Sequence, residues 1–265
     1  MANSTQPFAV YADTELPLPP KPPGMTRFVC MSDTHNHIRY NFEIPDGDVF
    51  IHAGDLTRTG TLSDCQRTLT WLKDLPHRTK LVIAGNHDLT FDTAHYEKTW
   101  DQWHRNKEDH ERIKTLYRQA NEYGVVYLED EEYTLPAEDG GWRCWGSPWQ
   151  PEFCDWGFNL PRGPELAAKW AQIPAHTDIL ITHGPPWSHL ARTMNDTDVG
   201  CEDLLHRVRQ VRPRAHVFGH IHEGYGYEFG TAADGTEGTL FVNASTCTLT
   251  YKPLNPPVVF DLPLP

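Results

Sequence analysis

The side chains of this chain that are best suited to chemistry lie in five short segments. Two segments pair such residues two positions apart: Asp33 with His35 in SDTH, and His220 with His222 in GHIH. Side chains two apart in an extended backbone point to the same side, so each pair can converge on one point. The segments HAGD, AGNHD and THGPP add Asp55, Asn86, His87, Asp88 and His183. Carboxylates and imidazoles grouped in this way are typical ligands of a divalent metal ion.

Each of the five segments directly follows a short run rich in Val, Ile and Phe. The length and β-branched content of these runs predict buried strands. They cover residues 27–31, 49–53, 80–84, 178–182 and 216–218. Because ligands of open α/β sheets bind at the carboxyl ends of strands, we expect the five segments to meet in one cleft.

Further elements surround these runs. Apolar residues at helical spacing and suitable capping residues predict helices over residues 61–75, 108–123, 164–172 and 199–209. Three more strand-like runs occupy residues 225–229, 239–242 and 258–262. Strands that alternate with helices predict an α/β fold with helices outside the sheet.

The composition indicates one globular domain preceded by an arm. The chain has 265 residues, of which 38% are hydrophobic. We expect a proline-rich N-terminal arm over residues 1–24 and a single catalytic domain over residues 25–265. The arm lacks the pattern of a signal peptide, and no apolar stretch reaches the roughly 18 residues that cross a bilayer. The six cysteines form no C-x-x-C pair, so we expect a cytoplasmic protein with no disulfide framework and no membrane partner.

The charge balance limits the kind of partner. Asp and Glu number 36 against 23 Lys and Arg, which gives a formal net charge of -13. A surface of this charge repels a polyanion, so we expect no duplex nucleic acid as a partner. A small phosphate-bearing molecule must then meet a local positive centre.

Taken in order, the five segments resemble the pattern of the calcineurin-like metallophosphoesterases, D-x-H, G-D, G-N-H-[D/E], H and G-H-x-H. The resemblance spans Asp33 to His222 and fills every position. WGSPWQP, THGPP, GHIHEGYG and the C-terminal NAS and NPPVVFDLP are similar to a subfamily of small metallophosphoesterase-domain proteins, so nearly the whole chain is covered. The resemblance implies an α/β fold of four layers, in which two mixed β-sheets are flanked by helices.

The resemblance also implies two divalent metal ions. The first ion would bind Asp33, His35, Asp55 and His222, and the second would bind Asp55, Asn86, His183 and His220. Two neighbouring cations need a shared anionic ligand, and Asp55 is the natural bridge. Oxygen and nitrogen ligands without a thiolate suit manganese, iron, zinc or similar ions.

Other residues near the five segments are candidates for catalysis and substrate binding. By the resemblance, His87 faces the leaving oxygen and stabilises or protonates it, while Asp88 either orients that ring or caps the following turn. We expect the substrate to contact Asn86 and His87, and also Trp187 and His189, which follow THGPP. A nucleobase could stack on tryptophans of the cluster WRCWGSPWQPEFCDWGF, or those rings could fill the core.

The predicted function is a dinuclear metal-dependent phosphodiesterase that acts on a small phosphodiester or nucleotide, such as a cyclic nucleotide. A protein Ser/Thr phosphatase is one alternative, although GDLTRTG and AGNHD lack the second aspartate and the arginine of the family patterns G-D-x-x-D-R-G and R-G-N-H-E. A nucleotide-binding protein with little turnover is another. Such a protein would be expected to lose a metal ligand, and both histidines of GHIH are present.

Overall fold

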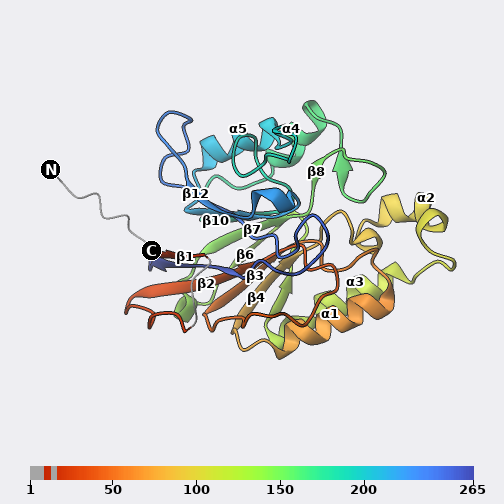
Figure 1. Ribbon diagram of the computed structural model, residues 1–265, viewed down its shortest axis with the longest axis horizontal. Helices are drawn as coiled ribbons and strands as arrows, with labels where there is room; N and C mark the ends of the chain where they lie inside the picture. Colours follow the sequence, from red (N-terminus) through yellow and green to blue (C-terminus); the bar gives the residue numbers. More distant parts are fainter. Residues whose placement is uncertain (1–8, 13–16) are drawn as a thin grey trace.

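The computed structural model describes residues 9–12 and 17–265, so part of the predicted arm lies outside the described residues. Within the described ranges, two six-stranded β-sheets pack face to face, and helices cover their outer faces (Figure 1). The predicted α/β fold of two mixed sheets flanked by helices is therefore confirmed.

The first sheet holds the N-terminal strands in the order β1-β14-β2-β3-β4-β5. Its strands are β1 (Ala9–Tyr11), β2 (Met25–Met31), β3 (Val49–Ala53), β4 (Thr79–Ile83), β5 (Val125–Tyr127) and β14 (Val258–Pro263). Strands β2 to β5 run parallel, whereas β14 is antiparallel to both of its neighbours. Strand β1 comes from the predicted arm, so this part of the arm pairs with the sheet edge.

The second sheet has the order β12-β13-β11-β10-β7-β6. Its strands are β6 (Glu131–Thr134), β7 (Arg143–Ser147), β10 (Ile179–Thr182), β11 (Ala215–Phe218), β12 (Gly226–Phe229) and β13 (Leu240–Asn243). The four central strands are parallel and the two edge strands antiparallel. A short parallel pair, β8 (Gln150–Pro151) and β9 (Asn159–Leu160), lies apart from both sheets.

The α-helices of the described residues are α1 (Leu62–Asp74), α2 (Thr93–Trp103), α3 (His110–Arg118), α4 (Pro164–Trp170) and α5 (Glu202–Val211). The 3-10 turns are η1 (Leu89–Phe91), η2 (Gln119–Tyr123), η3 (Ala137–Asp139) and η4 (His222–Gly224). The helix predicted over residues 108–123 is split between α3 and η2. Helix α2 was not predicted, because it buries only Tyr96 and Thr99 and so shows little apolar periodicity.

The core between the sheets aligns the ends of their strands. Phe28 and Phe260 stack with ring centroids 4.9 Å apart, and Ile51 and Ile181 of opposite sheets lie in the same buried cluster. Burial of this apolar surface is the main favourable contribution to folding. The parallel strands of both sheets end at one edge, where a bridge between Ser32 and Ser245 joins the segments that follow them.

The structure bears on two further expectations. The six cysteines, all among the described residues, are free. None of the helices in the described ranges has the length and apolar character required to traverse a bilayer.

The burial of His77 predicts that the folded protein loses stability in acid. Its side chain is 1% exposed, and its Nε2 lies 3.0 Å from the carbonyl oxygen of Pro45. Burial lowers the pKa of His77 to about 4, whereas the unfolded side chain titrates near about 6.5. The unfolded chain therefore takes up a proton first, and stability falls as the pH drops from about 6.5 to about 4.

Between pH 7 and pH 5, we expect the unfolding free energy of the unsubstituted chain to fall by about 2 kcal/mol more than that of His77→Leu. Urea denaturation at the two pH values measures this difference. His176→Leu is the matched control, because His176 is half exposed. An unchanged pH dependence in His77→Leu would contradict the assignment.

Candidate metal centre

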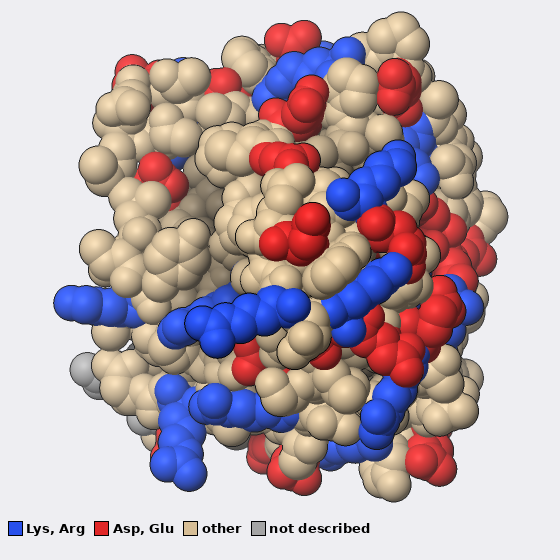
Figure 2. Space-filling model, turned by 90° about the vertical axis from the view of Figure 1, so that its right-hand side faces the viewer, with Lys and Arg blue, Asp and Glu red and all other residues tan. Residues whose placement is uncertain are grey.

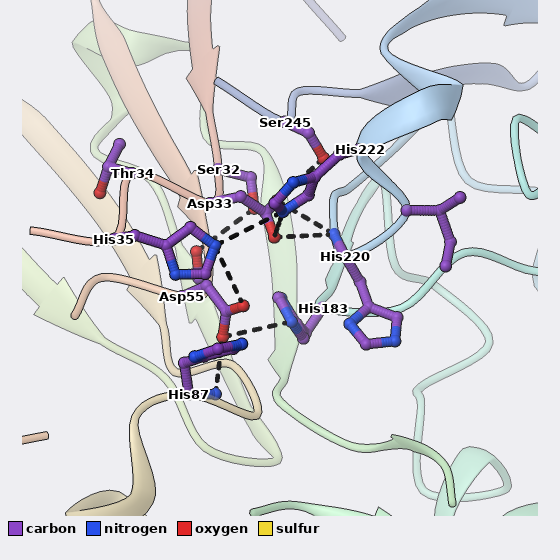
Figure 3. Close-up of polar contacts among 12 residues, drawn as sticks. Ser32, Asp33, Thr34, His35, Asp55, His87, His183, His220, His222 and Ser245 are labelled. Atoms are coloured by element: carbon purple, nitrogen blue, oxygen red, sulfur yellow. Dashed lines mark hydrogen bonds and ion pairs between the residues drawn. The ribbon is translucent and has the colours of Figure 1, made fainter. Parts of the chain in front are cut away.

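The five predicted segments meet at the shared edge of the two sheets, and most of their polar side chains point toward one another (Figure 3). Asp33 and His35 follow β2, Asp55 follows β3, Asn86 and His87 follow β4, His183 follows β10, and His220 and His222 follow β11. Residues up to 189 positions apart in sequence thus share one site, as strand ends in an α/β sheet predict.

Asp33, His35 and His222 form the first group of possible metal ligands. One ligand atom from each lies within 4.8 Å of the others. The Nε2 atoms of His35 and His222 are 3.4 Å apart, and His222 Nε2 is 3.4 Å from Asp33 Oδ1. Asp33 is fully buried, so its charge is removed from water.

A second group is built around Asp55. His183 Nε2 lies 3.4 Å from Asp55 Oδ1 and 2.9 Å from Asn86 Oδ1. The other oxygen of this carboxylate, Oδ2, lies 3.7 Å from His35 Nε2. Asp55 therefore presents one oxygen to each group, which is the arrangement that a bridging ligand requires.

The tautomers of two histidines test whether this donor set fits a cation. The Nδ1 atoms of His183 and His222 lie 2.9 and 3.1 Å from the carbonyl oxygens of Ala53 and Thr248. A carbonyl oxygen only accepts, so Nδ1 must carry the hydrogen in each ring. In the neutral rings both Nε2 atoms therefore carry lone pairs. A backbone acceptor on the outer ring nitrogen is typical of metal-bound histidine.

These lone pairs face other acceptors. His222 Nε2 faces Asp33, while His183 Nε2 faces the oxygens of Asp55 and Asn86. Acceptors at these distances repel one another unless a cation or a shared proton lies between them. The residues present thus fit divalent cations.

The pKa shifts at the site show that its carboxylates favour positively charged neighbours. Although burial opposes ionisation, the pKa of both Asp33 and Asp55 lies below its ordinary value, because histidines surround them. Burial also disfavours the charged form of His183, but the two carboxylates outweigh it and raise its pKa to about 9. Without metal, a proton on His183 therefore compensates these anions.

The loops that hold the ligands have unusual backbone geometry. Asp33, His35, Asp55 and His220 have φ values of 52°, 42°, 53° and 67°. Residues other than glycine seldom adopt such values, which cost free energy and cluster at functional sites. Backbone hydrogen bonds of 2.9 Å from Asp33 to Gly54 and of 3.0 Å from His35 to Asp55 hold two of these loops together.

Close packing explains the glycines of the segments GNHD and GHIH. A Cβ on Gly85 would lie 2.3 Å from Asp55 Oδ1, and a Cβ on Gly219 would lie 2.0 Å from Asp33 Oδ2. Both distances are too short for any side chain. These glycines let two backbone segments approach the two carboxylates.

His87 lies beside the metal groups, in contact with Arg58, Asp55 and Trp156. Its Nδ1 is 2.9 Å from the carbonyl oxygen of Arg58, and its backbone N–H donates to Asp55 Oδ1 at 2.8 Å. The ring of Trp156 lies 3.9 Å from the His87 ring, centroid to centroid. His87 also forms a possible ligand group with His35 and Asp55.

Asp88 does not orient the His87 ring, which corrects one of the two expectations for it. The Asp88 carboxylate is fully buried and accepts hydrogen bonds from the backbone of Leu56, Thr57 and Gly85 and from the Thr57 hydroxyl. Burial and the charge of Asp55 raise its pKa to about 6. The structure assigns Asp88 to fixing the loop that carries Asp55, and assigns the orientation of His87 to Arg58.

His220 is turned away from the two compact groups. Its backbone N–H donates to both oxygens of Asp33, at 3.1 and 3.0 Å. Its ring centroid lies 5.0 Å from that of His183, and the ring borders the same cavity as Asn86. Burial lowers the pKa of His220 to about 3, which keeps the ring neutral and able to act as a ligand.

Two residues predicted to contact the substrate, His189 and Trp187, do not line the cavity beside the metal groups. The His189 ring is buried and stacks on Phe241 with a centroid distance of 3.8 Å, and its Nδ1 lies 2.6 Å from Glu228 Oε1. Trp187 does not line the cavity at the described site. Both residues follow His183 closely in sequence, but the chain turns away from the site after Pro186, where it pairs with Cys201.

Sequence reasoning missed Ser245 and Tyr251. The Ser245 hydroxyl donates to Asp33 Oδ2 at 2.9 Å, and the Tyr251 ring centroid lies 4.8 Å from that of His35. Ser245 belongs to the NAS triplet, but a single serine after a strand does not by itself indicate a contact with a metal ligand. Nothing in the sequence pattern pointed to Tyr251.

A cavity of about 360 Å³ adjoins the metal groups. Asp55, Asn86, His87, His220 and His222 form its floor. Its other walls include Phe153, Arg162, Leu249 and Tyr251, with Phe153 57% exposed and Tyr251 47% exposed. A polar floor between partly apolar walls is common in sites that bind small molecules.

Comparisons with known proteins show which family and fold the chain resembles. The family described as "Calcineurin-like phosphoesterase" matches residues 26–224. Human "Metallophosphoesterase domain-containing protein 1" is 48% identical over 256 residues, which cover 93% of this chain and 74% of that protein, and its mouse counterpart is equally similar. The crystal structure of TT1561 of Thermus thermophilus matches with a TM-score of 0.51 at 11% identity, over 83% of this chain and 88% of that one.

We expect Ser245→Ala to lower the affinity for Mn²⁺ by about 10- to 100-fold, the usual effect of losing a hydrogen bond to a ligand. The Ser245 hydroxyl holds Asp33 Oδ2, and without it the carboxylate is free to turn. Competition against a fluorescent chelator measures the affinity. Ser63→Ala, on the exposed side of α1, is the control, and equal affinities in the two variants would count against this role for Ser245.

Proposed function

The chain belongs to the calcineurin-like phosphoesterase family, and from this premise we propose that it is a dinuclear metal-dependent phosphodiesterase. Its substrates are small phosphodiesters such as cyclic nucleotides, and its catalytic domain comprises residues 25–265. The proposal rests on the position of Asp55, because its two carboxylate oxygens face two separate groups of ligands.

Each ligand group has a defined set of residues. We assign Asp33, His35, Asp55 and His222 to the first cation, and Asp55, Asn86, His183 and His220 to the second. When bound, two such cations would supply a water-derived nucleophile near neutral pH and would stabilise the charge on the phosphoryl group. The nitrogen and oxygen donors suit manganese, iron or zinc.

The protein's own residues supply orientation and proton transfer. The Arg58 carbonyl oxygen accepts a hydrogen bond from His87 Nδ1–H, which leaves Nε2 free to face the leaving oxygen. In the imidazolium form of the ring Nε2 also carries a hydrogen and can donate it to that oxygen. Trp156 covers one side of this ring and limits its rotation. The cavity of about 360 Å³ accommodates a substrate of mononucleotide size, which supports a small phosphodiester.

The alternatives have weaker support. A protein Ser/Thr phosphatase would need the arginine and second aspartate that the corresponding segments lack. A nucleotide-binding protein without turnover would be expected to lack a ligand, whereas all seven predicted ligands follow strands that end at the shared edge of the two sheets.

We expect the purified chain with Mn²⁺ to hydrolyse bis-p-nitrophenyl phosphate, and Asp55→Asn to lower kcat by at least about 10³-fold. The amide cannot bridge two cations as a carboxylate does. Asp101→Asn, an exposed residue of α2, is the matched control and should keep full activity. Activity that survives in Asp55→Asn, or that resists a chelator, would refute the two-metal assignment.

His87 is tested by varying the leaving group. We expect His87→Ala to lower kcat by about 10² to 10⁴-fold for a substrate that releases an alkoxide. The loss should be much smaller when p-nitrophenolate leaves, because that anion needs no proton. Hydrolysis of methyl p-nitrophenyl phosphate and of a 2′,3′-cyclic nucleotide provides the two rates. Equal losses for both substrates would remove His87 from proton transfer.

A further inference from the structure

Helix α2 contributes little to the hydrophobic core, because it buries only Tyr96 and Thr99. It lies at the right-hand side of Figure 1, the side that Figure 2 views face on, where charged side chains of both signs are spread over the surface. The helix itself exposes several charged residues, Glu97, Lys98 and Asp101. Its C-terminal end is different, because it carries the half-buried rings of Trp103 and His104.

Trp103 is the outer ring of a stack of three that ends at His87. The ring centroids of Trp103 and Trp156 are 4.1 Å apart, with the ring planes tilted by 39°. Those of Trp156 and His87 are 3.9 Å apart, with a tilt of 31°. Within the described ranges Trp103 and His87 make no ring contact with each other, so they lie on opposite faces of Trp156.

Core packing does not account for this stack. Neither Trp103 nor Trp156 belongs to the buried apolar clusters of the part of the chain that the structure describes. Large aromatic rings usually gain most of their stabilising effect from burial. Two half-buried tryptophans that stack against a histidine beside a metal centre instead restrict where that histidine can turn.

The loop that carries Trp156 is tied down on two sides. The Gly157 N–H donates to the carbonyl oxygen of Asn86 at 3.1 Å, next to His87 in the chain. The Phe158 N–H donates to Asp92 Oδ2 at 2.8 Å, and Asp92 is the residue that caps the start of α2. The backbone beside Trp156 is therefore fixed both to the segment of His87 and to α2.

His104 connects the same end of α2 to the other support of His87. The His104 Nδ1 lies 2.7 Å from the Tyr96 hydroxyl, and its Nε2 lies 3.2 Å from Thr59 Oγ1. Thr59 directly follows Arg58, whose carbonyl oxygen lies 2.9 Å from His87 Nδ1. His104 thus holds the turn whose carbonyl oxygen orients the His87 ring.

We propose that Trp103 and His104 are positioning residues for His87. Trp103 fixes the face of the His87 ring through Trp156, and His104 fixes the carbonyl oxygen that binds its Nδ1. Neither residue lines the described cavity or belongs to the possible metal-ligand groups of the described residues, so their effect must pass through His87. This inference rests on the proposed function, in which His87 serves the leaving oxygen.

The dependence of the rate on the leaving group tests this role. We expect Trp103→Leu and His104→Ala each to lower kcat by about 10- to 100-fold with a 2′,3′-cyclic nucleotide, since a misplaced proton donor is a poor one. The rate with methyl p-nitrophenyl phosphate should be nearly unchanged, because p-nitrophenolate leaves without a proton. Trp103→Phe keeps a ring against Trp156 and should retain most of the activity.

Trp100→Leu is the matched control. Trp100 is a half-buried tryptophan of the same helix, and within the described ranges it makes no ring contact with Trp156. Both rates should stay unchanged in this variant.

A double-mutant cycle shows whether the effect passes through His87. In the His87→Ala background, Trp103→Leu should cause no further loss of kcat, because the residue that it positions is gone. Equal losses with the two substrates, or the same loss with and without His87, would report general damage to the fold and would overturn the proposal.

Nuclear magnetic resonance separates this inference from the proposed function. In the zinc-loaded chain, stacking on Trp156 should place the His87 ring protons upfield of those of exposed histidines, and His87→Gln identifies them by their loss. They should move downfield in Trp103→Leu and stay in place in Trp100→Leu. Unmoved signals in Trp103→Leu would contradict the positioning role whatever the rates are, whereas an unsubstituted chain that hydrolyses neither substrate would contradict the proposed function.

Discussion

The structure depends on one electrostatic constraint: two buried carboxylates and several imidazole lone pairs face one another at distances that only a positive charge makes favourable. Asp33 and Asp55 are 0% and 2% exposed, and water cannot screen them. Backbone carbonyls fix the tautomers of His183 and His222, so neither ring can turn an N–H toward these anions without becoming charged. Divalent cations resolve the repulsion, and in their absence protons on these rings do so in part.

The rest of the fold keeps these groups at close distances. Parallel strands of two facing sheets end at one edge, and left-handed turns at Asp33 and Asp55 aim the carboxylates inward. Gly85 and Gly219 allow other loops to reach them. The four hydrogen bonds accepted by Asp88 lock the Asp55 loop. The free energy spent on strained turns is recovered from the apolar core between the sheets.

The sequence predicted the strands and the clustering of ligands because both depend on local patterns. Short β-branched runs favour strands through their own composition, and a residue that directly follows a strand lies at the end of that strand in the sheet. Side chains set by loop packing were not predictable in this way. His189 follows His183 by six positions, yet it stacks on Phe241 of another strand. Trp156 was one aromatic among many, and its contact with His87 arises from a loop after β8.

The central claim is that two cations share Asp55. Anomalous diffraction from crystals soaked in Mn²⁺ tests it directly, since each manganese ion gives a peak independent of any assumed role for the residues. The account predicts two peaks separated by roughly 3.5–4 Å, with an oxygen of Asp55 beside each. No peak near Asp55, or a single peak without a second ion beside it at saturating metal, would contradict the account.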